Sequence, residues 1–227
     1  NQHTPEDREA ILFGTAGFLS PTLHETAPPD SQEWLEDIWT RWWKHRLDYE
    51  SPPNRSPAWS TRATRPGNHP QRRLAALAAA AAQWNSLSSL ARQAPPFTNF
   101  SKALAELNEP FWDHHHTLQS NRTEKPIKLL GKSRLEEFLI NTLYPLNLEN
   151  WDAFAKVRAA APNQKVKRCC ERLFGSLEKA KPYLKFAWQH QALLQVYQDF
   201  CLQDLSDCAD CPFPSQLAQW KPTPSHD

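Results

Sequence analysis

Proline divides this chain into stretches whose apolar residues recur at helical spacing. There are twenty prolines, with clusters at 52–57, 66–70 and 95–96, against only five glycines. So few glycines leave few tight hairpin turns, and the prolines fall mostly between the periodic stretches, where they end helices. The sequence therefore predicts an all-α fold, a compact array of about eight to ten helices.

Two of the expected helices begin at recognisable caps. Asp30–Ser31 precedes a stripe of tryptophans and aliphatic residues, and Ser133 with Glu136 forms a capping-box pattern. Alanine and leucine make the stretch 71–93 strongly helical by propensity. The expected helices cover 6–19, a segment starting at 30, 71–93, 98–108, 110–117, 133–145, 151–160, 164–177 and 182–202.

The extent of the chain suggests one helical domain over residues 1–227, with a subdivision near 118–130 and a cysteine-containing C-terminal segment, 201–227. The chain starts at Asn1 and contains no methionine, so we expect a fragment of a longer protein whose missing part could hold an active site. No run of about 18 apolar residues and no signal peptide occur, which predicts a soluble, cytoplasmic protein without a membrane partner.

Positive charge is concentrated although the formal net charge is only +1. No Asp or Glu occurs between Ser51 and Ala105, which carries six arginines and a lysine. Arginine suits the forked recognition of phosphate, so this stretch predicts a nucleic-acid or phosphate surface. The alternative is structural: the arginines pair with acids of other helices or bind carbonyl groups at helix ends.

A second basic group begins the helix expected from Ser133. Gly131 to Ser133 resembles the end of a phosphate-binding loop, but Pro126 stands where its first glycine belongs, which rejects that motif. A helix start with cationic side chains still favours an anion, with ordinary capping as the alternative. We expect both basic groups to lie near each other and to line a basic groove. The candidate anion-binding residues are Arg62, Arg65, Asn68, Arg72, Arg73, Lys132, Ser133 and Arg134.

Three of the five cysteines fall within eleven residues: Cys201, Cys208 and Cys211. The Cys-x2-Cys spacing lets two thiolates reach one metal, so zinc or an iron–sulfur cluster would fit, with Cys170, Cys169 or His190 as a fourth ligand. The alternatives are reduced cysteines in a packed or loose segment, or a disulfide. The neighbouring aspartates disfavour a free thiolate nucleophile, because negative charge raises the pKa of a thiol.

Other features give weaker signals. His114 to His116 cannot all bind one ion from a helix, since consecutive side chains point about 100° apart, so we expect a surface or partly packed run. The ten tryptophans include four on the helix starting at 30, so some could mark a contact surface. No catalytic motif is present in the chain, which leaves enzyme activity undecided.

Several segments of the chain form a recognisable series, in order: 11–19, 62–78, 112–115, 130–133, 140–145 and 191–194 with Cys201, Cys208 and Cys211. Together they resemble the bacterial domain-of-unknown-function family DUF2851, in its C-terminal helical part. The resemblance implies an N-terminal domain absent from this chain, and the family has no established activity to carry over.

Three functions remain open at this point. The first is an accessory module that binds nucleic acid or another phosphate-bearing ligand. The second is a structural platform for the missing N-terminal domain or a partner protein. The third is a fragment of a metal-dependent enzyme centred on the cysteines.

Overall fold

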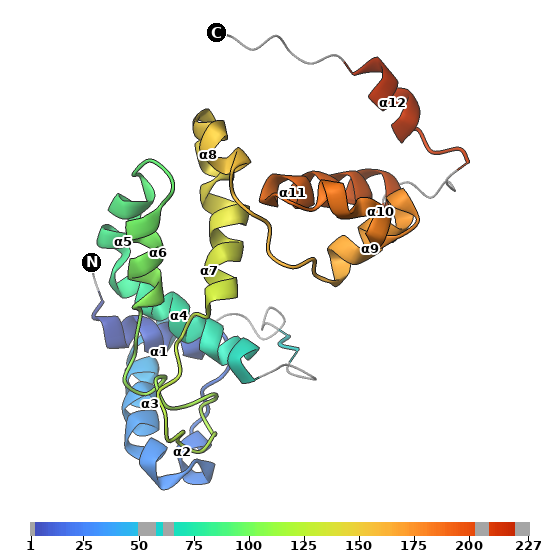
Figure 1. The fold of residues 1–227 in the computed structure, drawn as a ribbon. Coiled ribbons are helices and arrows are strands. Elements are labelled where there is room, and N and C mark those ends of the chain that lie inside the picture. The colour runs from blue at the N-terminus through green and yellow to red at the C-terminus, as the bar shows by residue number, and fades with distance from the viewer. Residues whose placement is uncertain (1–2, 50–57, 61–65, 203–208, 221–227) are drawn as a thin grey trace. The chain divides into compact units, whose positions relative to one another are not determined.

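The computed structural model describes residues 3–49, 58–60, 66–202 and 209–220. Within these ranges it contains twelve α-helices, several 3-10 and π-helical turns, and no strand beyond an isolated bridge between Arg158 and Phe186 (Figure 1). The prediction of an all-α fold is confirmed, and the helices are slightly more numerous than expected. No helix in the described part of the chain is long and apolar enough to cross a membrane.

The chain divides into two compact units, residues 1–143 and 144–227. The boundary between them lies between Leu143 and Tyr144, beyond the 118–130 segment at which the sequence suggested a subdivision. Whether the chain folds as a single domain, with 201–227 as a distinct segment, stays a prediction.

The first unit is built around its N-terminal helix. Helix α1 packs against both α3 and α4 (Figure 1). The helices of this unit are α1 (Pro5–Thr15), α2 (Leu23–Thr26), α3 (Pro29–Tyr49), α4 (Pro70–Ala82), α5 (Trp84–Ala91), α6 (Thr98–Ala105) and α7 (Lys132–Phe138), followed by a π-helical turn (Leu139–Leu143).

The core of the first unit is aromatic. The Phe13 ring of α1 stacks on Trp112 with 5.3 Å between ring centroids, and Trp34 of α3 stacks on Phe111 at 3.8 Å. Trp112 is fully buried and donates a hydrogen bond of 2.7 Å from Nε1 to Glu9. Residues 106–131, which contain no helix, thus supply part of the core.

Several helix boundaries differ from the sequence prediction, and each difference has a packing cause. The expected helix 71–93 breaks at Gln83, because Leu87 is buried and α5 packs against α6, which overrides alanine propensity. The expected helix 110–117 is a set of turns, since the carbonyls of Trp112 and His115 accept hydrogen bonds from a side chain instead.

Both predicted caps are wrong. Helix α3 begins at Pro29, and Ser31 is buried with its hydroxyl 3.2 Å from Nε2 of His115. Helix α7 begins at Lys132 after Gly131, without a side-chain cap, so Ser133 lies within the first turn. At α3 the hydroxyl that the sequence assigned to a cap makes a buried contact instead, whereas α7 begins without a side-chain cap and contains no buried residue.

The second unit is organised around α9. Asn163 caps α9 by accepting the N–H of Val166, and Gly175 ends it in the left-handed conformation with φ of 76°. Its buried core is Val166, Cys170 and Ala180. The helices of this unit are α8 (Trp151–Ala155), α9 (Gln164–Phe174), α10 (Leu177–Ala180), α11 (Ala187–Val196), which a π-helical turn continues (Tyr197–Leu202), and α12 (Phe213–Gln219).

Candidate functional site

Arg72, which the sequence assigned to an anion, is a buried structural residue. Its Nη1 donates to the carbonyl oxygens of Trp112 (2.8 Å) and His115 (2.6 Å). Its Nη2 donates to those of Ile127 (3.2 Å) and Lys128 (2.9 Å). Burial lowers the pKa of Arg72, and the negative charge of Asp113 opposes this. The guanidinium therefore fastens the helix-free segment to α4, and the structural alternative holds for this arginine.

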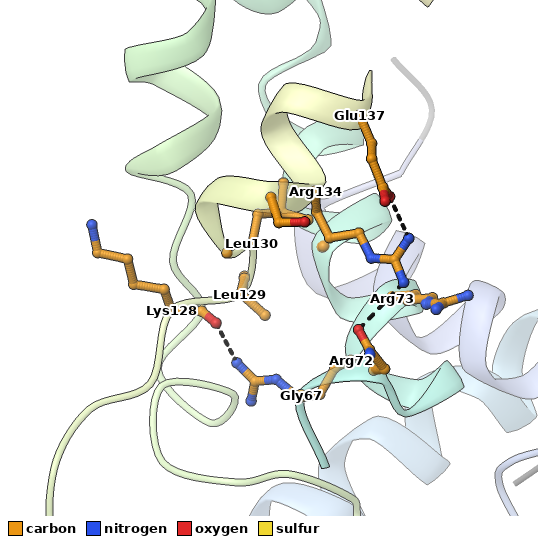
Figure 2. Close-up of a pocket in the computed structure, with 12 residues that line it drawn as sticks. Gly67, Arg72, Arg73, Lys128, Leu129, Leu130, Arg134 and Glu137 are labelled. Atoms are coloured by element: carbon orange, nitrogen blue, oxygen red, sulfur yellow. Dashed lines mark hydrogen bonds and ion pairs between the residues drawn. The ribbon is translucent and has the colours of Figure 1, made fainter. Parts of the chain in front are cut away.

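A cavity of about 800 Å³ opens beside this anchor, within the first unit (Figure 2). It brings together the start of α4 and, more than 50 residues later in the sequence, the segment 128–131 with the α7 helix that follows it. Its lining residues are Gly67, Asn68, Arg72, Arg73, Ala76, Lys128, Leu129, Leu130, Gly131, Ser133, Arg134 and Glu137. The two basic groups of the sequence thus contribute to the same cavity.

Arg73 and Arg134 are the cationic groups available in this cavity. The side chain of Arg73 is exposed and makes no hydrogen bond or ion pair with another described residue; the backbone N–H of Arg73 donates to the carbonyl of His69. Arg134 is held in place by an ion pair of 2.6 Å with Glu137 and a hydrogen bond of 3.4 Å to Oδ1 of Asn68. Figure 2 shows the Lys128 side chain running away from both arginines, so its backbone rather than its ammonium group faces the cavity.

The remaining predicted anion-binding residues lie in different places. Ser133 lines the cavity, whereas Lys132 is 89% exposed at the side chain, pairs with Glu136 at 3.8 Å and does not line it. Arg62 and Arg65 fall outside the described residues, shortly before Gly67 in the sequence.

Glu137 is the lining residue that sequence reasoning missed. It lies three residues after Arg134 on α7, which is the spacing of a favourable ion pair on a helix. That spacing was a usable signal. The segment 128–130 gave no such signal in the sequence, because its position at the cavity depends on the hydrogen bonds from Arg72.

Two of the cysteines belong to the core of the second unit. Cys170 is fully buried, and burial, then the charge of Glu171, raises the pKa of its thiol. Cys169 donates from Sγ to the carbonyl of Leu193 at 2.8 Å, and burial raises its pKa to about 12. Both thiols are therefore held in the protonated form, which binds metal poorly.

The positions of the other three cysteines leave the metal prediction untested. Cys201 lies in the π-helical turn after α11, Cys211 is half-buried just before α12, and Cys208 is outside the described residues. Among the residues that are described, no cysteine belongs to a group of three side chains close enough to share an ion. A metal on Cys201, Cys208, Cys211 and Cys170 stays a prediction.

Of the three consecutive histidines, His114 and His115 contact different partners, whereas Nδ1 of His116 is buried without a hydrogen-bond partner in the described part of the chain. His115 is buried, stacks on Phe111 at 4.1 Å and lies 2.8 Å from that residue's carbonyl through Nδ1. His114 Nδ1 lies 2.8 Å from the carbonyl of Thr123. Burial, then the charge of Arg72, lowers the pKa of His116. The run is partly packed, as predicted, although it lies in turns and not in the helix from which the prediction was argued.

The chain belongs to a family of proteins of unknown function, DUF2851. The family model matches residues 1–174, which include all of the first unit and the cavity. Residues 191–194 and the three C-terminal cysteines, which the sequence had assigned to the end of the family, lie outside the match. No curated protein and no solved structure matches the chain.

Proposed function

We propose that the first unit is a binding module for phosphate-bearing ligands, and specifically for nucleic acid. The observation that carries the proposal is the meeting of two exposed arginines, Arg73 and Arg134, at one open cavity although they are distant in sequence. Two planar guanidinium groups present several N–H donors to the oxygens of a phosphate.

The local contacts favour this use. Arg134 is oriented by Asn68 and Glu137 before any ligand arrives, which lowers the entropy cost of binding. Arg73 has no described partner to displace. One carboxylate opposes two guanidinium groups, so the balance of charge remains positive. The volume of about 800 Å³ lies within the range typical of ligand pockets.

Nucleic acid is the favoured ligand class because the cavity is open and its cations are exposed. A site for one small phosphate would be expected to bury its cations more deeply. Arg62 and Arg65 precede Gly67 in the sequence, lie outside the described residues, and stay predicted phosphate contacts. Arg72 is left out of the binding set, since carbonyl groups occupy its guanidinium.

Fluorescence anisotropy with labelled single-stranded and duplex oligonucleotides tests the proposal. We expect binding at low salt whose affinity falls steeply with salt concentration. Arg73→Ala and Arg134→Ala should each lower the slope of log K against log salt by about 0.7–0.9, the value for one phosphate contact. Arg92→Ala is the matched control, since Arg92 is exposed at the end of α5 and does not line the cavity. No binding at low salt, or equal effects of all three changes, would overturn the proposal.

A protein-interaction platform is the second candidate. Trp43 is 52% exposed, and with Trp39, Thr40 and Pro21 it lines an apolar hollow of about 350 Å³. Exposed tryptophan is enriched at protein interfaces. If this second function is correct, the basic stretch serves the fold, as Arg72 does by holding backbone carbonyl groups. Trp43→Ser would then abolish a protein contact and leave oligonucleotide affinity unchanged.

A metal-dependent enzyme based on the cysteines is the third candidate. The observation in its favour is the close sequence spacing of Cys201, Cys208 and Cys211. Elemental analysis of the purified protein tests it: zinc or iron near one equivalent, lost in the triple serine variant, is the expected result. Less than a tenth of an equivalent of zinc or iron would rule out this third candidate.

A further inference from the structure

The packing of α1 on α3 gathers three side chains of metal-binding type. His3 directly precedes the N-cap Thr4, Asp7 lies in the first turn of α1, and His45 lies in α3. Each offers one ligand atom, and these atoms lie within 4.8 Å of one another. Residues 3 and 7 are joined by one helical turn, but His45 is brought to them only by the tertiary fold.

A buried nitrogen atom of this group, Nε2 of His45, has no hydrogen-bond partner among the described residues. Nε2 of His45 lies 3.7 Å from Oδ2 of Asp7, too far for a hydrogen bond. It is buried and has no hydrogen-bond partner in the described part of the chain. Both side chains are only 15% exposed. A buried polar atom without a partner destabilises the fold, and a bound cation would remove that cost.

The separation between His45 and Asp7 suits a metal after a small side-chain adjustment. Ligands about 2.0–2.1 Å from a tetrahedral zinc ion lie about 3.3–3.4 Å apart. The distance between His45 and Asp7 exceeds this by a few tenths of an ångström. The rings of His3 and His45 lie 5.0 Å apart edge to face, so their nitrogens can approach one ion without a clash between the rings.

The surrounding residues orient the three side chains. Nη1 of Arg41 donates to Oδ1 of Asp7 at 3.2 Å, which leaves Oδ2 facing His45. Asp37 pairs with the same guanidinium at 2.8 Å and offsets its charge. The hydroxyl of Tyr49 lies 2.8 Å from Nε2 of His3. Such contacts from outside the ligand set are typical of metal sites.

The three ligand types indicate which metal the group favours. Two imidazoles with one carboxylate favour zinc and related transition metals over magnesium and calcium, which prefer oxygen ligands only.

We propose that His3, Asp7 and His45 bind a divalent transition metal, with zinc as the preferred ion and water completing the coordination. The ion joins the start of α1 to the C-terminal half of α3. The site uses none of the cysteines and none of the residues that line the cavity of Arg73 and Arg134, so it stands independently of the proposed nucleic-acid binding.

The test is calorimetric titration of the full chain with zinc, made in a variant whose Cys201, Cys208 and Cys211 are serine so that thiolates cannot compete. We expect one equivalent to bind. His3→Ala and His45→Ala should each weaken zinc binding more than about tenfold. Loss of a residue that only supports a metal ligand typically weakens binding by about tenfold or more, and loss of a ligand itself should weaken it further. His24→Ala, a half-buried histidine on α2, should bind as the parent does.

Cobalt supplies a spectroscopic readout that a merely structural role of these residues would not affect. Added cobalt should give visible absorption without a thiolate charge-transfer band, and His3→Ala should remove it. Circular dichroism checks that each variant is folded. If His45→Ala does not fold, the result for His3→Ala, which changes a residue outside the helices, tests the proposal. No binding to the parent, or unchanged binding in folded His3→Ala, would overturn the proposal.

Discussion

Gly14 of α1 lies against the face of the Trp42 indole in α3, with no room between them for a side chain. A Cβ built at Gly14 would overlap three atoms of the Trp42 ring. Helices α1 and α3 can therefore approach this closely because position 14 carries only hydrogen. This contact fixes the pair of helices that also holds His3, Asp7 and His45.

Gly14→Ala should destabilise the first unit by about 1–3 kcal/mol or more, since the added methyl must displace the buried Trp42 ring. Urea denaturation followed by tryptophan fluorescence measures the change. Gly131→Ala is the control, because a Cβ there meets nothing within 4 Å and φ is −79°; it should stay within about 0.5 kcal/mol. Equal stability of both variants would contradict the close approach.

The neighbouring arginines 72 and 73 should give opposite phenotypes. Arg72→Ala leaves four carbonyl groups without their donor and should cost at least about 1–3 kcal/mol, the cost of one buried acceptor left without a partner. Arg73→Ala should change stability by less than about 0.5 kcal/mol while it weakens oligonucleotide binding. Chemical denaturation and anisotropy on the same two variants separate these outcomes. A stable, folded Arg72→Ala protein would show that the anchor is dispensable.

Glu9 should make stability fall as pH rises. Burial, then the charge of Glu109, raises its pKa to about 8 in the folded protein, although the hydrogen bond from Trp112 opposes this. The folded state therefore keeps a proton that the unfolded state releases above about pH 4.5, so this contribution to stability is complete below that pH and is lost as pH approaches 8.

Glu9→Gln keeps an oxygen acceptor for Trp112 but cannot ionise. We expect urea midpoints of this variant to fall less between pH 5 and pH 8 than those of the parent. The comparison with the parent is needed because burial lowers the pKa of His69, His116 and His190, and these groups change stability in the opposite sense over part of the range. Parallel pH profiles would show that Glu9 ionises normally.

Cysteine alkylation should distinguish the core thiols from the rest. Cys169 and Cys170 are buried with raised pKa values, so iodoacetamide should modify them only after unfolding. Cys211 is half-buried and should react in the native protein. Peptide mass spectrometry after timed labelling measures each site. Native labelling of Cys170 at the rate of Cys211 would contradict its place in the core.

The all-α class followed from glycine and proline usage, and most helices were predicted near their true positions. The cap predicted at Ser31 failed because a tertiary contact outweighed local preference. Ser31 looked like a cap but bonds to His115, which is 84 residues away. No local pattern reports such a partner.

The candidate cavity was predictable in part. Asn68, Arg73, Ser133 and Arg134 were identified and line it. The different fates of Arg72 and Arg73 were not predictable, because the alanines that follow them are too uniform to show which face of α4 is buried. His45 gave no signal at all, since only the packing of α1 on α3 pairs it with His3 and Asp7.

Arg72 donates its hydrogen bonds to the main chain, and not to the side chains, of the segment that it holds. Its four acceptors are carbonyl oxygens, which every amino acid supplies. Related proteins could therefore exchange residues at 127 and 128 freely and keep the same loop path, whereas no other amino acid at 72 offers the same planar set of donors. Sequence drift in the loop and invariance at that one helical position would be the evolutionary mark of this arrangement.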